Sequence, residues 1–204
     1  MAESPLAAGD FANWLNGFRA GLATGSSVDV PCDGCTACCT SGQFVHIGPD
    51  ETDTLAHIPG ELLAPAPRLP AGHVVLGYDS AGRCPMLIDG ACSIYAHRPR
   101  ACRLYDCRVY AAAGVDVEAA KPALASRVAR WRFNHPAPID RRLHDAVEAA
   151  ATMIRDDIEL AAEGIRPRSP ADLAVLAIAV HDAGDVESDP AAVRVAVRQT
   201  LSTH

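Results

Sequence analysis

The chain has 204 residues, a formal net charge of -7 and eight cysteines. A chain of this length can bury a hydrophobic core without covalent cross-links, so disulfides are not required for folding. The longest apolar run, Leu173–Val180, is far shorter than the roughly 20 residues of a membrane-spanning helix, and the arginines are too scattered to form one basic face. We therefore expect neither a membrane protein nor nucleic acid as the main partner.

The first residues, Met1–Pro5, carry no positively charged side chain and lead into no continuous apolar run. Such a start is not typical of a secretory signal, so we expect a cytoplasmic protein. Dense cysteine patterns in that compartment indicate metal or redox chemistry more often than disulfides. A disulfide framework is the weaker alternative, because the adjacent Cys38 and Cys39 cannot easily reach disulfide geometry with each other.

An amphipathic helix is predicted from Asp10 to Ala23, with Asp10 as a plausible N-cap. Its apolar stripe is formed by Phe11, Trp14, Leu15, Phe18 and Leu22, which we expect in the core. Shorter elements follow in the middle of the chain. They are, in order, a strand over Gln43–Ile47, a short helix that begins at Pro49–Glu51 and ends before Pro59, a proline-rich loop over Ala64–Pro70, a strand over His73–Tyr78 and a turn over Asp79–Gly82.

A hairpin is predicted around Asp89-Gly90, a dipeptide favoured in tight turns because both central residues need positive φ. The hairpin would bring Cys84 and Cys92 close in space. A helical turn starting at Pro99 would present Cys102 toward the same region, with Cys107 just beyond its end.

The remainder of the chain, from Glu118 onward, is expected to be helical. The predicted helices cover Glu118–Phe133, Asp140–Glu163, Ala171–Asp182 and Pro190–Thr200, with breaks at Asn134–Pro136, Gly164–Pro167 and Gly184-Asp185. Ser169-Pro170 and Ser188-Asp189-Pro190 have the composition of helix starts. Because alanine is abundant, we expect close packing of these helices around small side chains.

Together these elements predict a helix-rich α+β protein. We expect an N-terminal amphipathic helix in residues 1–28 and a small, irregular, cysteine-rich metal module with short strands or a hairpin in residues 29–110. A C-terminal bundle of about four helices in residues 111–204 would pack on the module, making one compact unit.

The cysteines are the candidate metal ligands, because thiolates suit zinc and iron–sulfur clusters, which usually take four thiolates per centre. They are Cys32, Cys35, Cys38, Cys39, Cys84, Cys92, Cys102 and Cys107. Eight thiolates allow two complete centres, or one centre and spare thiols.

The cysteine spacing slightly favours iron–sulfur over zinc. Cys-x2-Cys-x2-Cys matches the start of the bacterial ferredoxin run, and Cys84-Pro85 could supply its final cysteine from a distance. The same Cys-x2-Cys turns also serve zinc, and Gly34 supplies the backbone freedom that such a turn needs. In extended backbone Cys38 and Cys39 would point apart, which predicts two neighbouring centres or a spare thiol. One assignment gives Cys32, Cys35, Cys38 and Cys84 to the first centre and Cys39, Cys92, Cys102 and Cys107 to the second.

Four arginines crowd the last two cysteines. We expect Arg98 and Arg103 to offset the negative charge of the thiolates and to donate hydrogen bonds to sulfur or a bound cofactor. For Arg100 and Arg108, ion pairs with carboxylates at the surface are an equally good interpretation.

These residues resemble a known family. The resemblance is carried by CxxCxxCC at Cys32–Cys39, Cys-Pro-x-Leu at Cys84–Leu87, Gly-x-Cys-x-Ile-Tyr at Gly90–Tyr95, and Arg-Pro-x-x-Cys-Arg-x-Tyr-x-Cys at Arg98–Cys107. This order is similar to the YkgJ-like cysteine-cluster family of zinc- or iron-chelating domains, and it covers about residues 32–108. Members often carry proline where this chain has Asp106, a departure that affects the local turn more than ligation. The resemblance implies metal chelation, and a similar domain occurs in flagellin lysine-N-methylase.

Enzyme motifs are sparse. The sequence has no glycine-rich turn for S-adenosylmethionine, no Cys-x3-Cys-x2-Cys, no phosphate loop and no nucleophile elbow. His144 and Glu148 lie four apart on a predicted helix, where a solvated face is favoured over a metal site. Three histidines, His46, His73 and His97, could each replace a thiolate, although enough cysteines are present.

The sequence thus predicts a metal-binding protein that holds an iron–sulfur cluster or zinc, with a redox or accessory role. The alternatives are an enzyme or enzyme subunit that modifies a partner protein, resembling a lysine N-methylase, and a structural zinc module for protein interaction. Whether the chain is an enzyme, which protein it binds and its oligomeric state all stay open.

Overall fold

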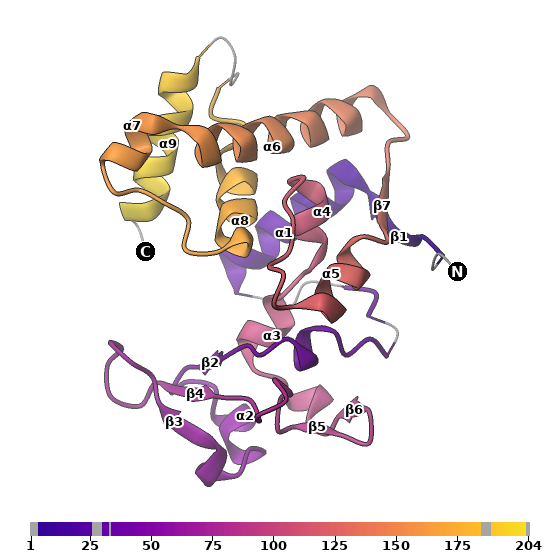
Figure 1. Cartoon of the computed structure of the whole chain (residues 1–204), viewed down its shortest axis with the longest axis vertical. Helices are drawn as coiled ribbons and strands as arrows, with labels where there is room; N and C mark the ends of the chain where they lie inside the picture. The colour runs from indigo at the N-terminus through magenta and orange to yellow at the C-terminus, as the bar shows by residue number, and fades with distance from the viewer. Residues whose placement is uncertain (1–3, 26–29, 33, 185–188, 203–204) are drawn as a thin grey trace. The chain divides into compact units, whose positions relative to one another are not determined.

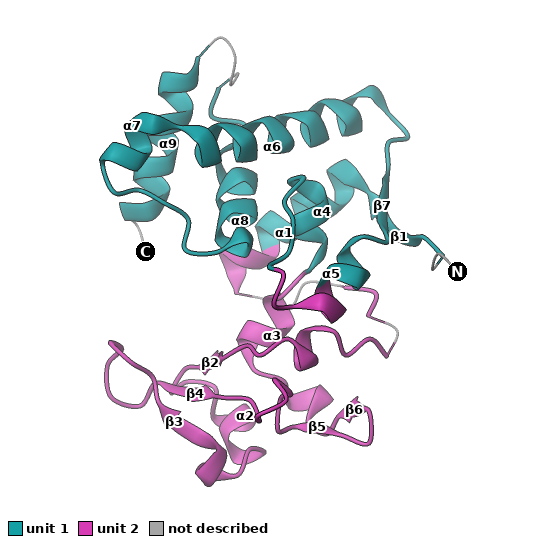
Figure 2. Cartoon of the chain, in the orientation of Figure 1, with its two compact units in different colours: residues 1–20, 107–118, 125–204 teal, residues 21–106, 119–124 magenta. Residues whose placement is uncertain are grey.

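The computed structural model describes residues 4–25, 30–32, 34–184 and 189–202 (Figure 1). The chain divides into two units, shown in Figure 2. Unit 1 contains residues 1–20, 107–118 and 125–204, and unit 2 contains residues 21–106 and 119–124. The helix-rich α+β class and the cysteine-rich segment are confirmed, whereas the predicted boundaries at residues 28 and 110 stay predictions. No helix among the described residues is both long and apolar enough to cross a bilayer.

Helix α1 (Phe11–Thr24) confirms the predicted amphipathic helix. Phe11, Trp14, Leu15 and Phe18 are buried, but Leu22 is 41% exposed. Asp10, the predicted N-cap, is the last residue of strand β1 (Leu6–Asp10) and directly precedes the helix; its capping role stays a prediction. The backbone amide of Ala12 donates to Oδ1 of the buried Asp140 at 2.9 Å.

A parallel pair of strands in unit 1 corrects the predicted helix over residues 118–133. Helix α5 (Pro122–Val128) covers only part of that range, and the chain then forms strand β7 (Trp131–Asn134) beside β1. Leu6 pairs with Trp131 in this register. The side chain of Trp131 is buried while Arg132 is exposed, an alternation typical of a strand with one buried face. Pairing with a segment more than 100 residues away outweighs the local helix preference.

Helices form the remainder of unit 1. They are α4 (Arg108–Ala112), α6 (Pro138–Asp156), α7 (Ile158–Ala162), α8 (Pro170–Val180) and α9 (Pro190–Ser202). The single helix predicted over residues 140–163 is wrong, because Asp157 is extended (φ -73°, ψ 115°) and caps α7 by accepting the amides of Glu159 and Leu160. The side chain of Ser169 caps α8 as predicted.

Alanine side chains lie where α6 and α8 are buried in unit 1. Ala150 and Ala151 of α6 and Ala174 and Ala177 of α8 are fully buried, so small side chains allow close helix approach. At the start of α9, Asp189 accepts the amide of Ala192 at 3.1 Å, as its predicted capping role requires. The predicted contribution of residue 188 to that cap and the predicted break at residue 185 lie outside the described residues.

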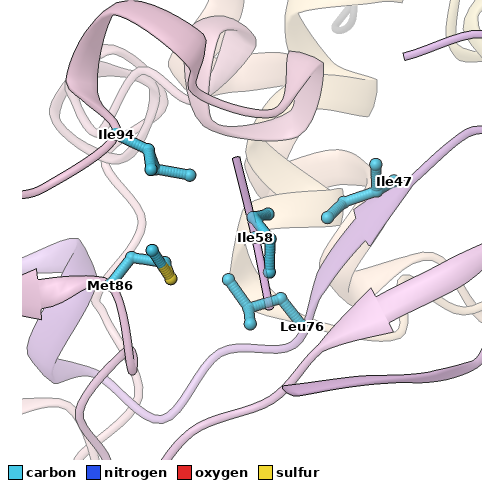
Figure 3. Packing of buried hydrophobic residues seen from close by; sticks show 5 residues of the cluster. All are labelled: Ile47, Ile58, Leu76, Met86 and Ile94. Carbon is cyan, nitrogen blue, oxygen red and sulfur yellow. The ribbon is translucent and has the colours of Figure 1, made fainter. Parts of the chain in front are cut away.

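Unit 2 contains a three-stranded antiparallel sheet in the order β2-β4-β3, formed by β2 (Val45–Ile47), β4 (Val74–Leu76) and β3 (Leu63–Pro65). Strand β3 occupies the start of the segment predicted to be a loop, because Ala64 pairs with Val75 of the central strand. Helix α2 (Thr52–Ala56) and the 3₁₀ turns η1 (Cys38–Thr40), η2 (Gly60–Leu62) and η3 (Tyr95–His97) complete this part. Figure 3 shows the core cluster of unit 2, made of Ile47, Ile58, Leu76, Met86 and Ile94.

The predicted hairpin is confirmed by β5 (Leu87–Ile88) and β6 (Ala91–Cys92). Both central residues have positive φ, 52° at Asp89 and 75° at Gly90, as this type of turn requires. Helix α3 (Arg100–Leu104) follows Pro99, which is its N-cap. Cys92 is the last residue of β6 and Cys102 lies in α3, so both belong to unit 2.

Candidate metal centre

All eight cysteines lie in the described part of the chain, where none of them forms a disulfide. The first two form a tight turn, in which the amide of Cys35 donates to the carbonyl of Cys32 at 2.8 Å. Gly34 has a φ of +74°, which confirms that glycine provides a conformation costly for other residues. The amide of Ala37 then donates to Sγ of Cys35 at 3.5 Å. A backbone donor aimed at sulfur stabilises a thiolate ligand.

Cys38 and Cys39 lie in the 3₁₀ turn η1, not in extended backbone. Their Sγ atoms are therefore 3.9 Å apart instead of pointing away from each other. With zinc–sulfur bonds of about 2.3 Å, two thiolates on one tetrahedral ion would lie about 3.8 Å apart. The expectation that the Cys38 and Cys39 side chains point apart in extended backbone is therefore wrong. One metal ion can bind both sulfur atoms.

Cys84 approaches this pair from a distant part of the sequence. Its backbone amide donates to the carbonyl of Cys39 at 2.7 Å, and its own carbonyl accepts the amide of Leu87 at 3.0 Å. Leu87 is paired with Cys92 in the hairpin. Both Cys84 and Cys92 pack against the core cluster of unit 2, so the core fixes the positions of these two ligand candidates.

Electrostatic interactions with Cys38, Cys84 and Cys92 change the pKa of Cys102. Burial raises the pKa of Cys102 to about 12, and the charges of Cys38, Cys84 and Cys92 raise it further. Burial also raises the pKa of Cys84, with contributions from Cys92 and Cys38. The pKa of Cys38 is raised by its hydrogen bond with Cys39, by burial and by the charge of Cys39. These half-buried thiols resist becoming thiolates together unless a cation compensates the charge.

We call Cys38, Cys39, Cys84, Cys92 and Cys102 the thiol group. It combines residues from both predicted four-cysteine sets. In the described part of the chain, no three of its sulfur atoms all lie within 4.8 Å of one another. Metal binding would therefore draw them closer together.

Arg98 lies beside the thiol group, and its charge lowers the pKa of Cys102. Its guanidinium carbon lies 3.7 Å from the centre of the Tyr95 ring. Its Nε is buried and has no hydrogen-bond partner among the described residues. An unsatisfied buried donor is costly, and a metal-bound sulfur or cluster sulfide would satisfy it. The role predicted for Arg98 stays a prediction.

The other arginines have different contacts. The guanidinium of Arg103 donates to the main-chain carbonyl of Arg98, which stabilises the turn before α3. Arg100 forms an ion pair with Asp50, the surface pairing considered from sequence. Arg108 is buried in unit 1 and donates to the carbonyl of Ala8 at 3.1 Å.

Cys107 belongs to unit 1, where it precedes helix α4. The indole Nε1–H of Trp131 donates to its Sγ at 3.2 Å. The helical pattern predicted around Trp131 gives no sign of this donor. The contact of Tyr95 with Arg98 does have a signal in the sequence, because residues spaced by three in a helical turn are neighbours.

Residues 31–118 match the family model described as "CxxCxxCC: Putative zinc- or iron-chelating domain". This segment is similar to the CxxCxxCC family. The match contains all eight cysteines and both units contribute to it, so the CxxCxxCC segment is a metal-binding cysteine-cluster domain. No curated protein and no solved structure matches the chain.

Proposed function

We propose that the thiol group holds an iron–sulfur cluster, with Arg98 as a donor to cluster or cysteine sulfur. The observation that carries the proposal is that thiols from three separate segments, residues 38–39, 84–92 and 102, act on one another electrostatically, beside the buried Nε of Arg98, which has no hydrogen-bond partner in the described part of the chain. Thiolates are the ligands that iron–sulfur clusters take. When bound, the cluster would supply one-electron redox chemistry.

The protein residues have separable tasks in this proposal. Cys84 and Cys92 would hold the cluster against the core of unit 2, because both pack on the apolar cluster. Burial around Cys102 and Cys38 would limit access of water. The positive charge of Arg98 would offset part of the negative charge of a thiolate-bound centre. Electron transfer to a partner protein, or support of an enzyme that modifies one, would be the resulting role.

A zinc ion is the second candidate, and the Cys38–Cys39 distance is compatible with it. At 3.9 Å, the two sulfurs are separated by nearly the edge of a tetrahedral zinc site, about 3.8 Å. The same separation suits a single iron of a two-iron cluster, which also takes two thiolates. Zinc would make the CxxCxxCC segment a structural module without redox activity.

Purification without oxygen, followed by a visible spectrum and by iron, zinc and sulfide analysis, tests the proposal. Brown colour that bleaches with dithionite, together with iron and sulfide in cluster proportions, is expected. A colourless protein with stoichiometric zinc would contradict it.

Substitution in α3 tests the ligand set. Cys102→Ser should release metal and expose unit 2 to protease, because ligation energy contributes directly to folding in such modules. Ala101→Ser is the matched control, since it adds the same hydroxyl at an exposed neighbouring position of α3. Unchanged metal content in Cys102→Ser would remove that residue from the ligand set.

A further inference from the structure

Unit 2 contains a second group of metal-ligating side chains that uses no cysteine. Asp53 lies in the first turn of α2, and His57 follows the last residue of that helix. Their spacing of four residues puts both side chains on one face of the helix. His97 is the last residue of η3. The ligand atoms of Asp53, His57 and His97 lie within 4.8 Å of one another.

Hydrogen bonds fix the two segments that carry these residues. The buried carboxylate of Glu51 accepts the amide of Gly48 at 2.9 Å and the amide of Arg100 at 2.5 Å. The hydroxyl of the buried Thr54 donates to the carbonyl of Arg98 at 3.4 Å. Because these bonds flank the group in the sequence, the backbone positions are set without any metal.

The hydrogen bonds among Asp53, His57 and His97 determine which ring nitrogens are available to bind a metal ion. Nδ1 of His57 lies 2.8 Å from the main-chain oxygen of Asp53. A carbonyl oxygen only accepts hydrogen bonds, so Nδ1 carries the proton and Nε2 of the neutral ring keeps its lone pair. Metal-bound histidines characteristically have their second ring nitrogen held in this way.

His97 forms the other half of the group. Its Nδ1 lies 2.8 Å from Oδ2 of Asp53, and its ring stacks on that of His57 with centroids 3.6 Å apart and planes 8° apart. The hydrogen bond from His97 is the main cause that lowers the pKa of Asp53. The carboxylate is therefore ionised at neutral pH and available to a cation, although Arg103 also acts on it.

We propose that His57, His97 and Asp53 bind one divalent first-row transition-metal ion, with at least one coordination position open to solvent. Two imidazoles and one carboxylate are the ligand set of open zinc sites and of non-haem iron(II) sites. Nitrogen and oxygen ligands distinguish this site from the thiol group, which presents only sulfur. Because lone pairs lie in the ring planes, binding turns at least one ring out of the stack. The side chains are 41%, 37% and 72% exposed for His57, His97 and Asp53, so solvent and ions have access.

A matched control exists in the same unit. Nε2 of His46 lies 2.9 Å from Nδ1 of His73, and these rings also stack. The neighbouring carboxylate of Asp50 is bound by Arg100, and among the described residues this pair is not part of a set of three possible ligands. His73→Ala therefore removes a half-buried histidine from a similar pair without touching the proposed site.

The test is a Zn²⁺ titration of the full chain purified with its thiolate-bound metal, followed by calorimetry and by NMR of the histidine rings. Wild type and His73→Ala should bind one equivalent more than His57→Ala, His97→Ala or Asp53→Asn. The ring signals of His57 and His97 should shift, while those of His46 and His73 stay. Equal binding by wild type and the His57 and His97 variants, or shifts confined to His46 and His73, would overturn the proposal.

Co²⁺ separates this site from the thiol group. Cobalt bound by thiolates gives an intense sulfur-to-cobalt charge-transfer band, whereas cobalt bound by imidazole and carboxylate does not. The additional equivalent should appear without that band in wild type and should be lost in His97→Ala. An additional equivalent that carries the band would place the ion on cysteine and refute the assignment. Failure of the iron–sulfur proposal would leave the ring-signal result intact, so the two hypotheses fail separately.

Discussion

Leu76→Ala tests whether the core of unit 2 supports metal binding. Leu76 is 2% exposed and packs with Ile47, Ile58, Met86 and Ile94. Truncating such a leucine removes apolar contacts and leaves a cavity, which costs about 3 kcal/mol. Since Cys84 and Cys92 pack against this cluster, we expect the loss to reach the thiol group.

The size of the effect follows from linkage between folding and ligation. If the metal binds only the folded form of unit 2, a lower folded fraction weakens the apparent affinity in proportion. A loss of about 3 kcal/mol corresponds to roughly 100-fold. Where the metal-free unit is already largely unfolded, the whole factor should appear in the apparent affinity. Competition with a chelator of known affinity measures it.

Leu69→Ala is the matched control for this experiment. Leu69 is in the same unit but is 48% exposed, so the same truncation should cost less than about 0.5 kcal/mol. Its apparent metal affinity should stay within about threefold of wild type, which corresponds to that free energy. Equal affinities for Leu76→Ala and Leu69→Ala, with a metal-free unit 2 shown by circular dichroism to be unfolded, would refute the coupling between core and thiol group.

Two further predictions concern unit 1. Ser169→Ala removes the side-chain oxygen that accepts the Asp172 amide at the start of α8. The free energy of unfolding, measured with urea, should therefore fall by about 1 kcal/mol. An effect no larger than that of the exposed Ser202→Ala would contradict the cap. Burial lowers the pKa of His144 below 6.5, so the unfolded state binds the proton first as the pH falls. The stability of unit 1 should therefore decrease as the pH drops below about 6.5, and the decrease should be smaller in His144→Gln. A pH dependence identical to wild type would show that His144 is not its source.

Features that depend on a few neighbouring residues could be predicted from the sequence. The turn at Asp89-Gly90 requires two residues with positive φ, and both have it. Ser169 caps α8 because a side-chain oxygen, an extended backbone and a following proline coincide there. In each case the relevant contacts lie within about four residues, so the sequence pattern contains the whole interaction.

Features that depend on distant partners could not be predicted. Trp131 lies in a strand because β1, at the other end of the sequence, supplies its hydrogen bonds. The continuous helical pattern across Asp157 likewise concealed a capping site, whose carboxylate also binds Arg194 at 2.8 Å. Local periodicity predicted helix at both places, and tertiary partners determined the outcome.

The metal chemistry of unit 2 shows the same division between local and distant information. Cysteine spacing identified the candidate ligands, but the angle between the Cys38 and Cys39 side chains depends on a 3₁₀ turn that spacing does not specify. His97 was considered only as a substitute for a thiolate, whereas the fold brings it to Asp53 and His57, more than 35 residues earlier in the sequence. A soft sulfur group and a nitrogen–oxygen group thus come from interleaved segments of one small unit. Because the two groups differ in ligand type, substitutions in one leave the ligands of the other in place, which makes the role of each group separately testable.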